Sequence, residues 1–203
     1  MADGEMTTLG TQICNQIAAV FSATNHPDAL EVIIAAITAA AKNNRRIFVH
    51  AGGRELLMIK SLCMRLAHLG LSVHVVGDVT TPPIHRDDLL IASAGPGAVS
   101  TVEAICRVAK RNSATVLFIT AQPESVSCKE LASQVAYLPA QTMADDQQES
   151  GGGGGGVGAR ELLPMGSLYE GALFVLFEMV VFKLGEILGE SPEAIRLRHT
   201  NLE

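Results

Sequence analysis

Five short runs of hydrophobic residues stand out in the pattern of apolar and polar positions along the chain. Four of them are rich in Val and Ile and do not alternate cleanly with polar residues, which is typical of strands covered on both faces. The runs predict strands at residues 46–50, 72–76, 88–93, 115–120 and 134–138.

Segments with the apolar spacing of helices lie between these runs. The clearest are residues 55–70 and 99–112. A third, residues 26–43, precedes the first strand, and its Pro27 suits a first helical turn. Strands that alternate with helices predict an α/β fold, a single doubly wound domain whose parallel sheet of five strands carries helices on both faces.

The pattern breaks after the last predicted strand. Residues 144–160 are acidic and then contain six consecutive glycines, which lose much conformational entropy when they are ordered. No Gly-Lys-Ser/Thr sequence follows the glycines, so the segment does not match a P-loop. We therefore expect a flexible loop inserted into the domain.

Residues 171–188 are the most apolar stretch and predict a long helix. Glu178 and Lys183 interrupt this stretch, whereas a membrane span needs about 20 nearly uncharged residues. A helix that is buried or faces another subunit is the better interpretation, and we expect no membrane association.

Length and composition narrow the class of protein. A chain of 203 residues can bury one sizeable core, so we expect residues 1–203 to form one domain. The net charge of −6, with no basic stripe, argues against nucleic acid as a partner. The four cysteines form no CxxC pair, which argues against a metal site or a disulfide framework. Together with an N-terminus unlike a signal peptide, this predicts a cytoplasmic protein.

Three turns follow predicted strands at the sheet edge where ligands bind in such folds: residues 50–55, 77–85 and 93–97. At two of them a helix begins, so free backbone N–H groups and the positive end of a helix dipole would face an anionic group. A Gly-rich turn between strand and helix is equally well explained as plain turn chemistry. The turns alone therefore leave both interpretations open.

The sequence of residues 46–97 resembles the sugar isomerase (SIS) domain, and its closest branch is 6-phospho-3-hexuloisomerase. The resemblance extends from about residue 30 to the C-terminus, with the polyglycine loop as an insertion. Its most specific marks are MRLAHLG, VVGDVTTPPI, LPMGSLYEGALFVLFE and the terminal RHTNLE. It implies a flavodoxin-like sheet, a homodimer or homotetramer, and aldose–ketose isomerisation of a sugar phosphate without metal or other cofactor.

The two glycine turns depart from the family pattern. The first resembles GAGRS, and here AGGRE places Glu55 at the serine. The second resembles SGSGET, and here AGPGAV places Ala94, Pro96 and Val99 at the two serines and the threonine. The family binds phosphate through these four hydroxyls, so the resemblance implies turns that keep their shape and lose those ligands. The candidate substrate-binding residues are Gly53, Arg54, Glu55, Ala94, Gly95, Pro96, Gly97, Val99 and Ser100.

Glu170 matches the candidate catalytic base of the family. Moving a carbonyl between neighbouring sugar carbons needs one group that removes and returns a proton through an enediol, and a partly desolvated glutamate suits this task. The spacing Ser167-x-x-Glu170 is also that of a capping box, and the two roles are compatible. Ser100-x-x-Glu103 has the same spacing, which favours a capping role for Ser100 over a ligand role.

His199 matches the histidine of the family's terminal RHxNLE pattern. In that role it would polarise the carbonyl or assist ring opening, in the site of a neighbouring subunit. The alternative is an exposed histidine on a frayed tail. His50, at the end of the first predicted strand, is a further histidine candidate at the binding edge.

The resemblance implies a phosphosugar isomerase that converts 3-hexulose 6-phosphate to fructose 6-phosphate, with Glu170 as base and His199 as assisting acid. The substituted turns favour an alternative, a sugar-binding or regulatory module that has kept the fold and lost ordinary phosphate binding. The expected ligand in both cases is a sugar or a sugar phosphate.

Overall fold

The computed structural model describes residues 2–22, 28–145 and 162–202. Its strands form one five-stranded sheet in the order β2-β1-β3-β4-β5, and every neighbouring pair is parallel. The predicted α/β class and parallel sheet are confirmed, and each strand overlaps its predicted segment. The strands are β1 (Ile47–Ala51), β2 (Val73–Val75), β3 (Leu89–Ser93), β4 (Thr115–Thr120) and β5 (Gln134–Tyr137).

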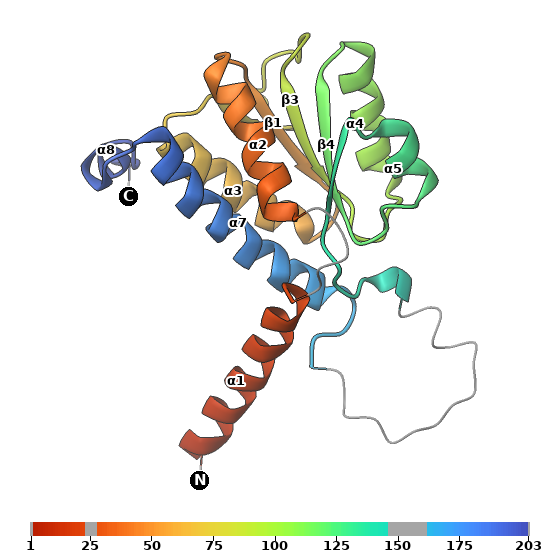
Figure 1. Cartoon of the computed structure of the whole chain (residues 1–203), viewed down its shortest axis with the longest axis vertical. Coiled ribbons are helices and arrows are strands. Elements are labelled where there is room, and N and C mark those ends of the chain that lie inside the picture. Colours follow the sequence, from red (N-terminus) through yellow and green to blue (C-terminus); the bar gives the residue numbers. More distant parts are fainter. Residues whose placement is uncertain (1, 23–27, 146–161, 203) are drawn as a thin grey trace.

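Helices cover both faces of the sheet (Figure 1). On one face lie α2 (Ala29–Lys42), α3 (Glu55–His68) and α7 (Ser167–Leu188), which share one hydrophobic cluster. On the other face α4 (Ser100–Arg111) and α5 (Val126–Leu131) pack into a second cluster. This two-sided cover is the doubly wound, flavodoxin-like arrangement.

Burial on both faces explains why the strands show no clean alternation. All five residues of β3 are buried. On β1, Val49 belongs to the cluster beneath α2, α3 and α7, whereas its neighbour Phe48 belongs to the cluster beneath α4 and α5. Successive side chains point to opposite faces, and both faces are dry, so apolar residues fill successive positions.

Among the elements whose bounds the structure describes, the sequence pattern did not predict α1 (Ala2–Val20), α5 and α8 (Pro192–Leu197). The last two have six residues each and begin at the serine caps Ser125 and Ser191. Helix α1 contains two glycines, Gly4 and Gly10, and projects away from the rest of the molecule near the start of α7 (Figure 1). It touches α7 through Ile17, whose side chain lies so close to Gly171 that an added Cβ would come within 2.9 Å of it.

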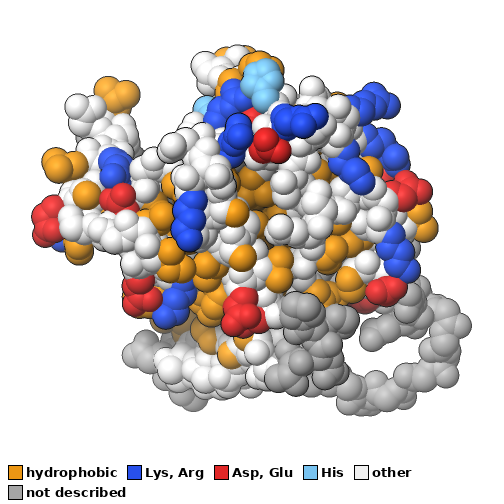
Figure 2. Space-filling view, turned by 45° about the horizontal axis from the view of Figure 1, so that its top comes forward, with side chains coloured by type: hydrophobic (Ala, Val, Ile, Leu, Met, Phe, Trp, Pro, Cys, Tyr) orange, Lys and Arg blue, Asp and Glu red, His pale blue; other side chains and the backbone are white. Residues whose placement is uncertain are grey.

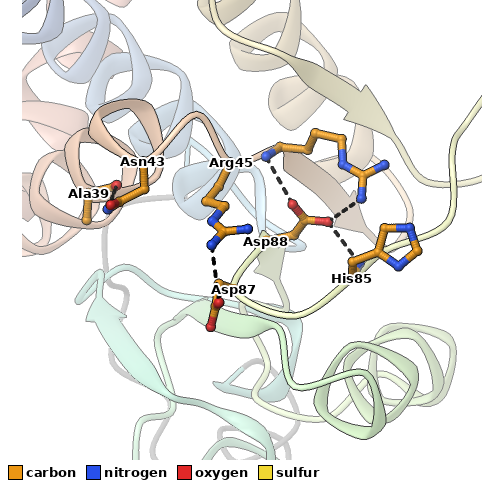
Figure 3. A network of polar contacts seen from close by, with 7 residues as sticks. Ala39, Asn43, Arg45, His85, Asp87 and Asp88 are labelled. Atoms are coloured by element: carbon orange, nitrogen blue, oxygen red, sulfur yellow. Dashed lines mark hydrogen bonds and ion pairs between the residues drawn. The ribbon is translucent and has the colours of Figure 1, made fainter.

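A partly buried ion pair, Arg46–Asp88, joins the starts of β1 and β3 (Figure 3). The Asp88 carboxylate accepts hydrogen bonds from the Arg46 guanidinium (2.7 Å) and from the backbone N–H groups of Arg46 (3.1 Å) and His85 (2.8 Å). Burial raises the pKa of Asp88, but these hydrogen bonds outweigh it and the net shift is downward. Figure 2 turns this end of the molecule toward the viewer and shows Lys and Arg side chains with acidic ones among them.

The predicted loop at 144–160 lies almost entirely outside the described residues. Its second residue, Asp145, is described and accepts hydrogen bonds from the Thr142 hydroxyl at 3.0 Å and the Gln122 amide at 3.2 Å. Within the described part of the chain, no helix is both long and apolar enough to span a membrane. The long apolar helix predicted at 171–188 is α7, which buries eight of its residues in the domain.

Candidate active site

A cleft of about 310 Å³ opens beyond the carboxyl ends of β1 and β3. These strands are neighbours in the sheet, and the helices that follow them, α3 and α4, lie on opposite faces. The turn after β1 therefore leads to one face of the sheet and the turn after β3 leads to the other. Open α/β sheets bind ligands where two such turns diverge. The cleft is lined by Gly52, Gly53, Arg54, Glu55, Pro96, Val99, Thr142, Met143, Met165, Gly166, Tyr169 and Glu170.

The carboxylate of Glu55 binds the turn that follows β3. The Gly95 N–H donates to both of its oxygens, at 3.0 and 3.2 Å, and the Ser93 hydroxyl donates to Oε2 at 2.6 Å. Glu55 is the first residue of α3, and Gly95 lies 40 residues further along the chain. The glycine turn after β3 is thus occupied by a side chain of the protein itself.

Tyr169 closes the other side of this turn. Its ring lies against Gly95, where an added Cβ would come within 2.9 Å of two ring carbons. Its hydroxyl is 3.3 Å from the Ser93 hydroxyl, so Glu55, Ser93 and Tyr169 form one polar chain. Because Tyr169 is buried and close to the Glu55 carboxylate, the pKa of its phenol is raised well above the usual value.

The pKa of Glu55 is raised above its usual value. Burial is the largest cause, and the nearby Glu170 carboxylate adds to it. The hydrogen bonds from Ser93 and Gly95 act in the opposite direction, because they stabilise the ionised form. Two carboxylates that influence each other therefore share the cleft.

Arg54 holds Glu170 in place. The guanidinium Nε lies 3.0 Å from Glu170 Oε1, and Nη2 donates to the Met165 carbonyl at 2.6 Å. The Glu170 side chain is 18% exposed, so it is largely withdrawn from water while it still lines the cleft. Burial raises its pKa, whereas the charge and hydrogen bond of Arg54 lower it, and the net shift is upward.

Neither of the two predicted capping boxes forms. The N-cap of α7 is Gly166 in a left-handed conformation, and the N-cap of α4 is Val99, neither of which has a side-chain capping bond. Glu170 pairs instead with Arg54, and Glu103 accepts a hydrogen bond from the Ser127 hydroxyl at 2.5 Å. Tertiary partners outcompete the local cap in both cases, because each carboxylate faces another helix or turn.

The structure brings together most of the predicted turn residues. Gly53, Arg54, Glu55, Pro96 and Val99 all line the cleft with Glu170. Four others do not line it. They are Gly95, whose N–H binds the Glu55 carboxylate, Ala94, which is buried in the core, Gly97, where an added Cβ would collide with Gln122 and Ser125, and Ser100, which is exposed.

Sequence reasoning missed Ser93, Tyr169 and Thr142. Ser93 and Thr142 are among the few buried polar residues of the described chain. Ser93 ends a strand directly before a glycine turn, and Tyr169 directly precedes the candidate base. These neighbours in the sequence were the signal that could have identified both as site residues. Their roles depend on contacts with residues distant in sequence.

His199 lies far from Glu170 within one chain. It follows α8, at the end of α7 opposite to Glu170 (Figure 1), and a helix of 22 residues is about 33 Å long. Its ring is exposed and lies 5.2 Å from that of His68. A role for His199 in catalysis therefore requires a neighbouring subunit. His50 lies on β1 with both ring nitrogens buried and without a hydrogen-bond partner among the described residues, and burial lowers its pKa.

In the described ranges, no three His, Cys, Asp or Glu side chains are grouped in a way that could hold a metal ion. The described chain also leaves its four cysteines as free thiols, of which Cys63, Cys106 and Cys128 are buried.

Known proteins resemble the chain over nearly its full length. No protein-family model matches it. A 3-hexulose-6-phosphate isomerase of Mycobacterium gastri is 33% identical over 208 residues, which cover 100% of this chain and 97% of that protein. A solved structure from Methanococcus jannaschii, from which a function as 3-hexulose-6-phosphate isomerase was inferred, has a TM-score of 0.72 at 25% identity and covers 94% of this chain and 97% of its own. The NanR protein of Vibrio vulnificus, solved in complex with ManNAc-6P, shares the fold, with a TM-score of 0.65 at 13% identity over 95% of this chain and 66% of its own.

Proposed function

The chain belongs to the family of the 3-hexulose-6-phosphate isomerases, and from this premise we propose that it is a sugar isomerase that moves a ketose carbonyl through an enediol. The first reaction to assay is the conversion of 3-hexulose 6-phosphate to fructose 6-phosphate. The observation that carries the proposal is the placement of Glu170: a largely buried carboxylate, held by Arg54, in a cleft at the carboxyl ends of the strands.

Glu170 would act as the base. In its ionised form it removes the proton from the carbon next to the carbonyl, which leaves an enediolate, and a proton on the former carbonyl oxygen completes the enediol. When the other enediol hydroxyl loses its proton to form the new carbonyl, Glu170 returns a proton to the carbon that carried the old one. The raised pKa strengthens it as a base, and the ion pair with Arg54 orients it and favours its ionised form. His199 of a neighbouring subunit would polarise the carbonyl or assist ring opening. No step in this scheme uses a metal or another cofactor, and we place the protein in the cytoplasm.

A second candidate function is a sugar-binding or regulatory module without turnover. The observation in its favour is the contact between Glu55 and Gly95, which fills the turn that the family uses for phosphate. Such a module would bind a sugar in the cleft and leave Glu170 idle. The two candidates differ in one measurable property, which is exchange of a carbon-bound proton with solvent.

Proton exchange in deuterated water tests the proposed function. Conversion through an enediol between carbons 2 and 3 should place deuterium on carbon 3 of fructose 6-phosphate or of fructose, whichever the protein accepts. Proton NMR would follow the loss of the carbon 3 signal, with protein-free samples as the reference. Binding of either ketose without any Glu170-dependent exchange would favour the module over the enzyme.

We also propose that the protein is a homo-oligomer, a dimer or tetramer. Phe174 and Phe182 are 49% and 64% exposed on α7, and with Leu30 and Met179 they line a largely apolar groove between α2 and α7. Exposed apolar surface of this kind is covered in most soluble proteins. Light scattering at micromolar concentration should give at least twice the monomer mass of 21.4 kDa. A stable monomer would contradict the assembly and the role of His199 together.

A further inference from the structure

The turn after β3 already holds a carboxyl group of the protein, that of Glu55. Backbone N–H groups at a strand–helix turn bind anions, and here the Gly95 N–H is directed at the Glu55 carboxylate. The Ser93 hydroxyl donates to the same carboxylate at 2.6 Å, and the Tyr169 ring lies against Gly95. To bind the Gly95 N–H, a phosphate would have to displace Glu55 from both of its donors, this N–H and the Ser93 hydroxyl.

The charge of the cleft also disfavours a phosphate. Among the described residues that line it, Arg54 is the one cation, and Glu170 already pairs with it at 3.0 Å. Glu55 adds a second carboxylate, so with both glutamates ionised the described lining carries a net charge of −1. A phosphate ester would enter a partly buried site in which the described residues offer no unpaired cation, at a considerable electrostatic cost.

The rest of the lining suits a neutral molecule. Pro96, Val99, Met143 and Met165 supply apolar walls. Val99 also fills the space between the two turns, because a Cβ at Gly52 would lie only 3.0 Å from its Cγ1. An ionised carboxylate has about four acceptor positions, and Glu55 uses three, so it retains capacity for a sugar hydroxyl.

From these contacts we infer that the Glu55 carboxylate takes the place of a phosphate group in the turn at Gly95. The cleft therefore selects an uncharged ketose over its phosphate ester. The inference rests on the proposed isomerisation and narrows its substrate class. In this role Glu55 determines substrate specificity, because a site without this carboxylate can bind phosphate in the same turn.

Calorimetry with fructose, fructose 6-phosphate and inorganic phosphate tests this role, at equal salt and at pH 8. The natural protein should bind fructose at least as tightly as fructose 6-phosphate. Glu55→Ser frees the Gly95 N–H and removes one negative charge, so its affinity for fructose 6-phosphate should rise at least tenfold. Inorganic phosphate should show the same direction, and fructose should gain nothing.

Two further variants make the test specific. Glu55→Gln keeps the size of the side chain and removes its charge, so it should give part of the gain even if the serine variant folds poorly. Glu31→Gln removes one charge from the exposed start of α2, outside the cleft lining, and should leave all three affinities unchanged.

The outcomes separate this inference from the proposed function. If the natural protein binds fructose 6-phosphate more tightly than fructose, and both Glu55 variants change that affinity less than threefold, the inference is wrong while the isomerase proposal stands. If the Glu55 variants gain phosphate affinity but no ketose exchanges its carbon 3 proton, the selectivity stands and the isomerase proposal is wrong.

Discussion

Replacing Glu170 with Gln should lower the turnover of the accepted ketose by roughly 10²–10⁴-fold, the usual contribution of a general base. Glutamine keeps the size of the side chain and can still accept a hydrogen bond from Arg54, so fold and ligand binding should persist. Steady-state turnover, the rate of deuterium incorporation at carbon 3, and calorimetric affinity for the same ketose would be measured on one preparation.

The pH profile gives an independent check on this assignment. A base must be ionised, and the pKa of Glu170 is raised by burial despite the opposing effect of Arg54. Turnover should therefore increase with pH around a midpoint above the usual range of a glutamate, which is near 4.3. Arg54→Met removes the group that lowers this pKa, so the midpoint should move further upward.

A matched control lies on the same helix. Glu186 pairs with Lys183 at 3.1 Å and is 55% exposed, and it lines neither the cleft nor the groove between α2 and α7. Glu186→Gln should leave turnover and pH midpoint unchanged. Unaltered turnover in Glu170→Gln would show that the carboxylate only positions Arg54, and the proposed mechanism would have to be abandoned.

Replacing Asp88 with Asn should lower the free energy of unfolding by about 2–4 kcal/mol at pH 7. The carboxylate is only 4% exposed and accepts three hydrogen bonds, so its loss leaves Arg46 without a counterion at the start of the sheet (Figure 3). We place the effect below that of a fully buried pair because the Arg46 side chain is 26% exposed. Urea unfolding at a fixed protein concentration would measure it.

The same pair should make stability depend on pH. The pKa of Asp88 is lowered in the folded protein, so its stabilising contribution is present above the unfolded value of about 3.9 and is lost as pH falls through the folded value. The gap between the natural protein and Asp88→Asn should therefore narrow in acid. A gap that widens in acid would show that the ionised carboxylate does not stabilise the fold.

Asp87 provides the neighbouring control. Its ion pair with Arg45 is longer, at 3.4 Å, and its side chain is 59% exposed. Asn also tolerates the positive φ of 67° at this position. Asp87→Asn should cost less than about 1 kcal/mol. Equal losses for the two variants would mean that burial of Asp88 is not what gives its pair its strength.

The sequence by itself determined the sheet and the edge that carries the cleft. Runs such as those of β3 and β4 are apolar at nearly every position, and that local property reports a strand covered on both faces. Alternation of these runs with helical segments implies a parallel sheet, whose carboxyl ends lie at one edge. The resemblance to the sugar isomerase family, rather than the hydrophobic pattern, predicted Arg54, Glu55 and Glu170 as site residues at this edge.

The hydrophobic pattern did not predict the helices at the two ends of the chain, α1 and α8. The helix α1 lacks a strong apolar stripe and includes Gly4 and Gly10, and it packs against α7, where Ile17 meets Gly171. Local pattern could not reveal a partner 154 positions away, as the residue numbers of that contact show. The same limit explains why the two predicted capping boxes do not form: Glu170 and Glu103 bind groups that are distant in the sequence.

The tertiary structure alone decided how the site residues pair. Sequence spacing placed Glu170 beside Ser167, but folding brings α7 against the first turn, where Arg54 takes the carboxylate. Sequence comparison placed Glu55 where a phosphate ligand is expected, and folding makes it the occupant of the turn at Gly95. The reason is physical. A charged group in a partly buried site takes the nearest donors that the fold offers, and which donors are nearest is set by strands and helices that are far apart along the chain.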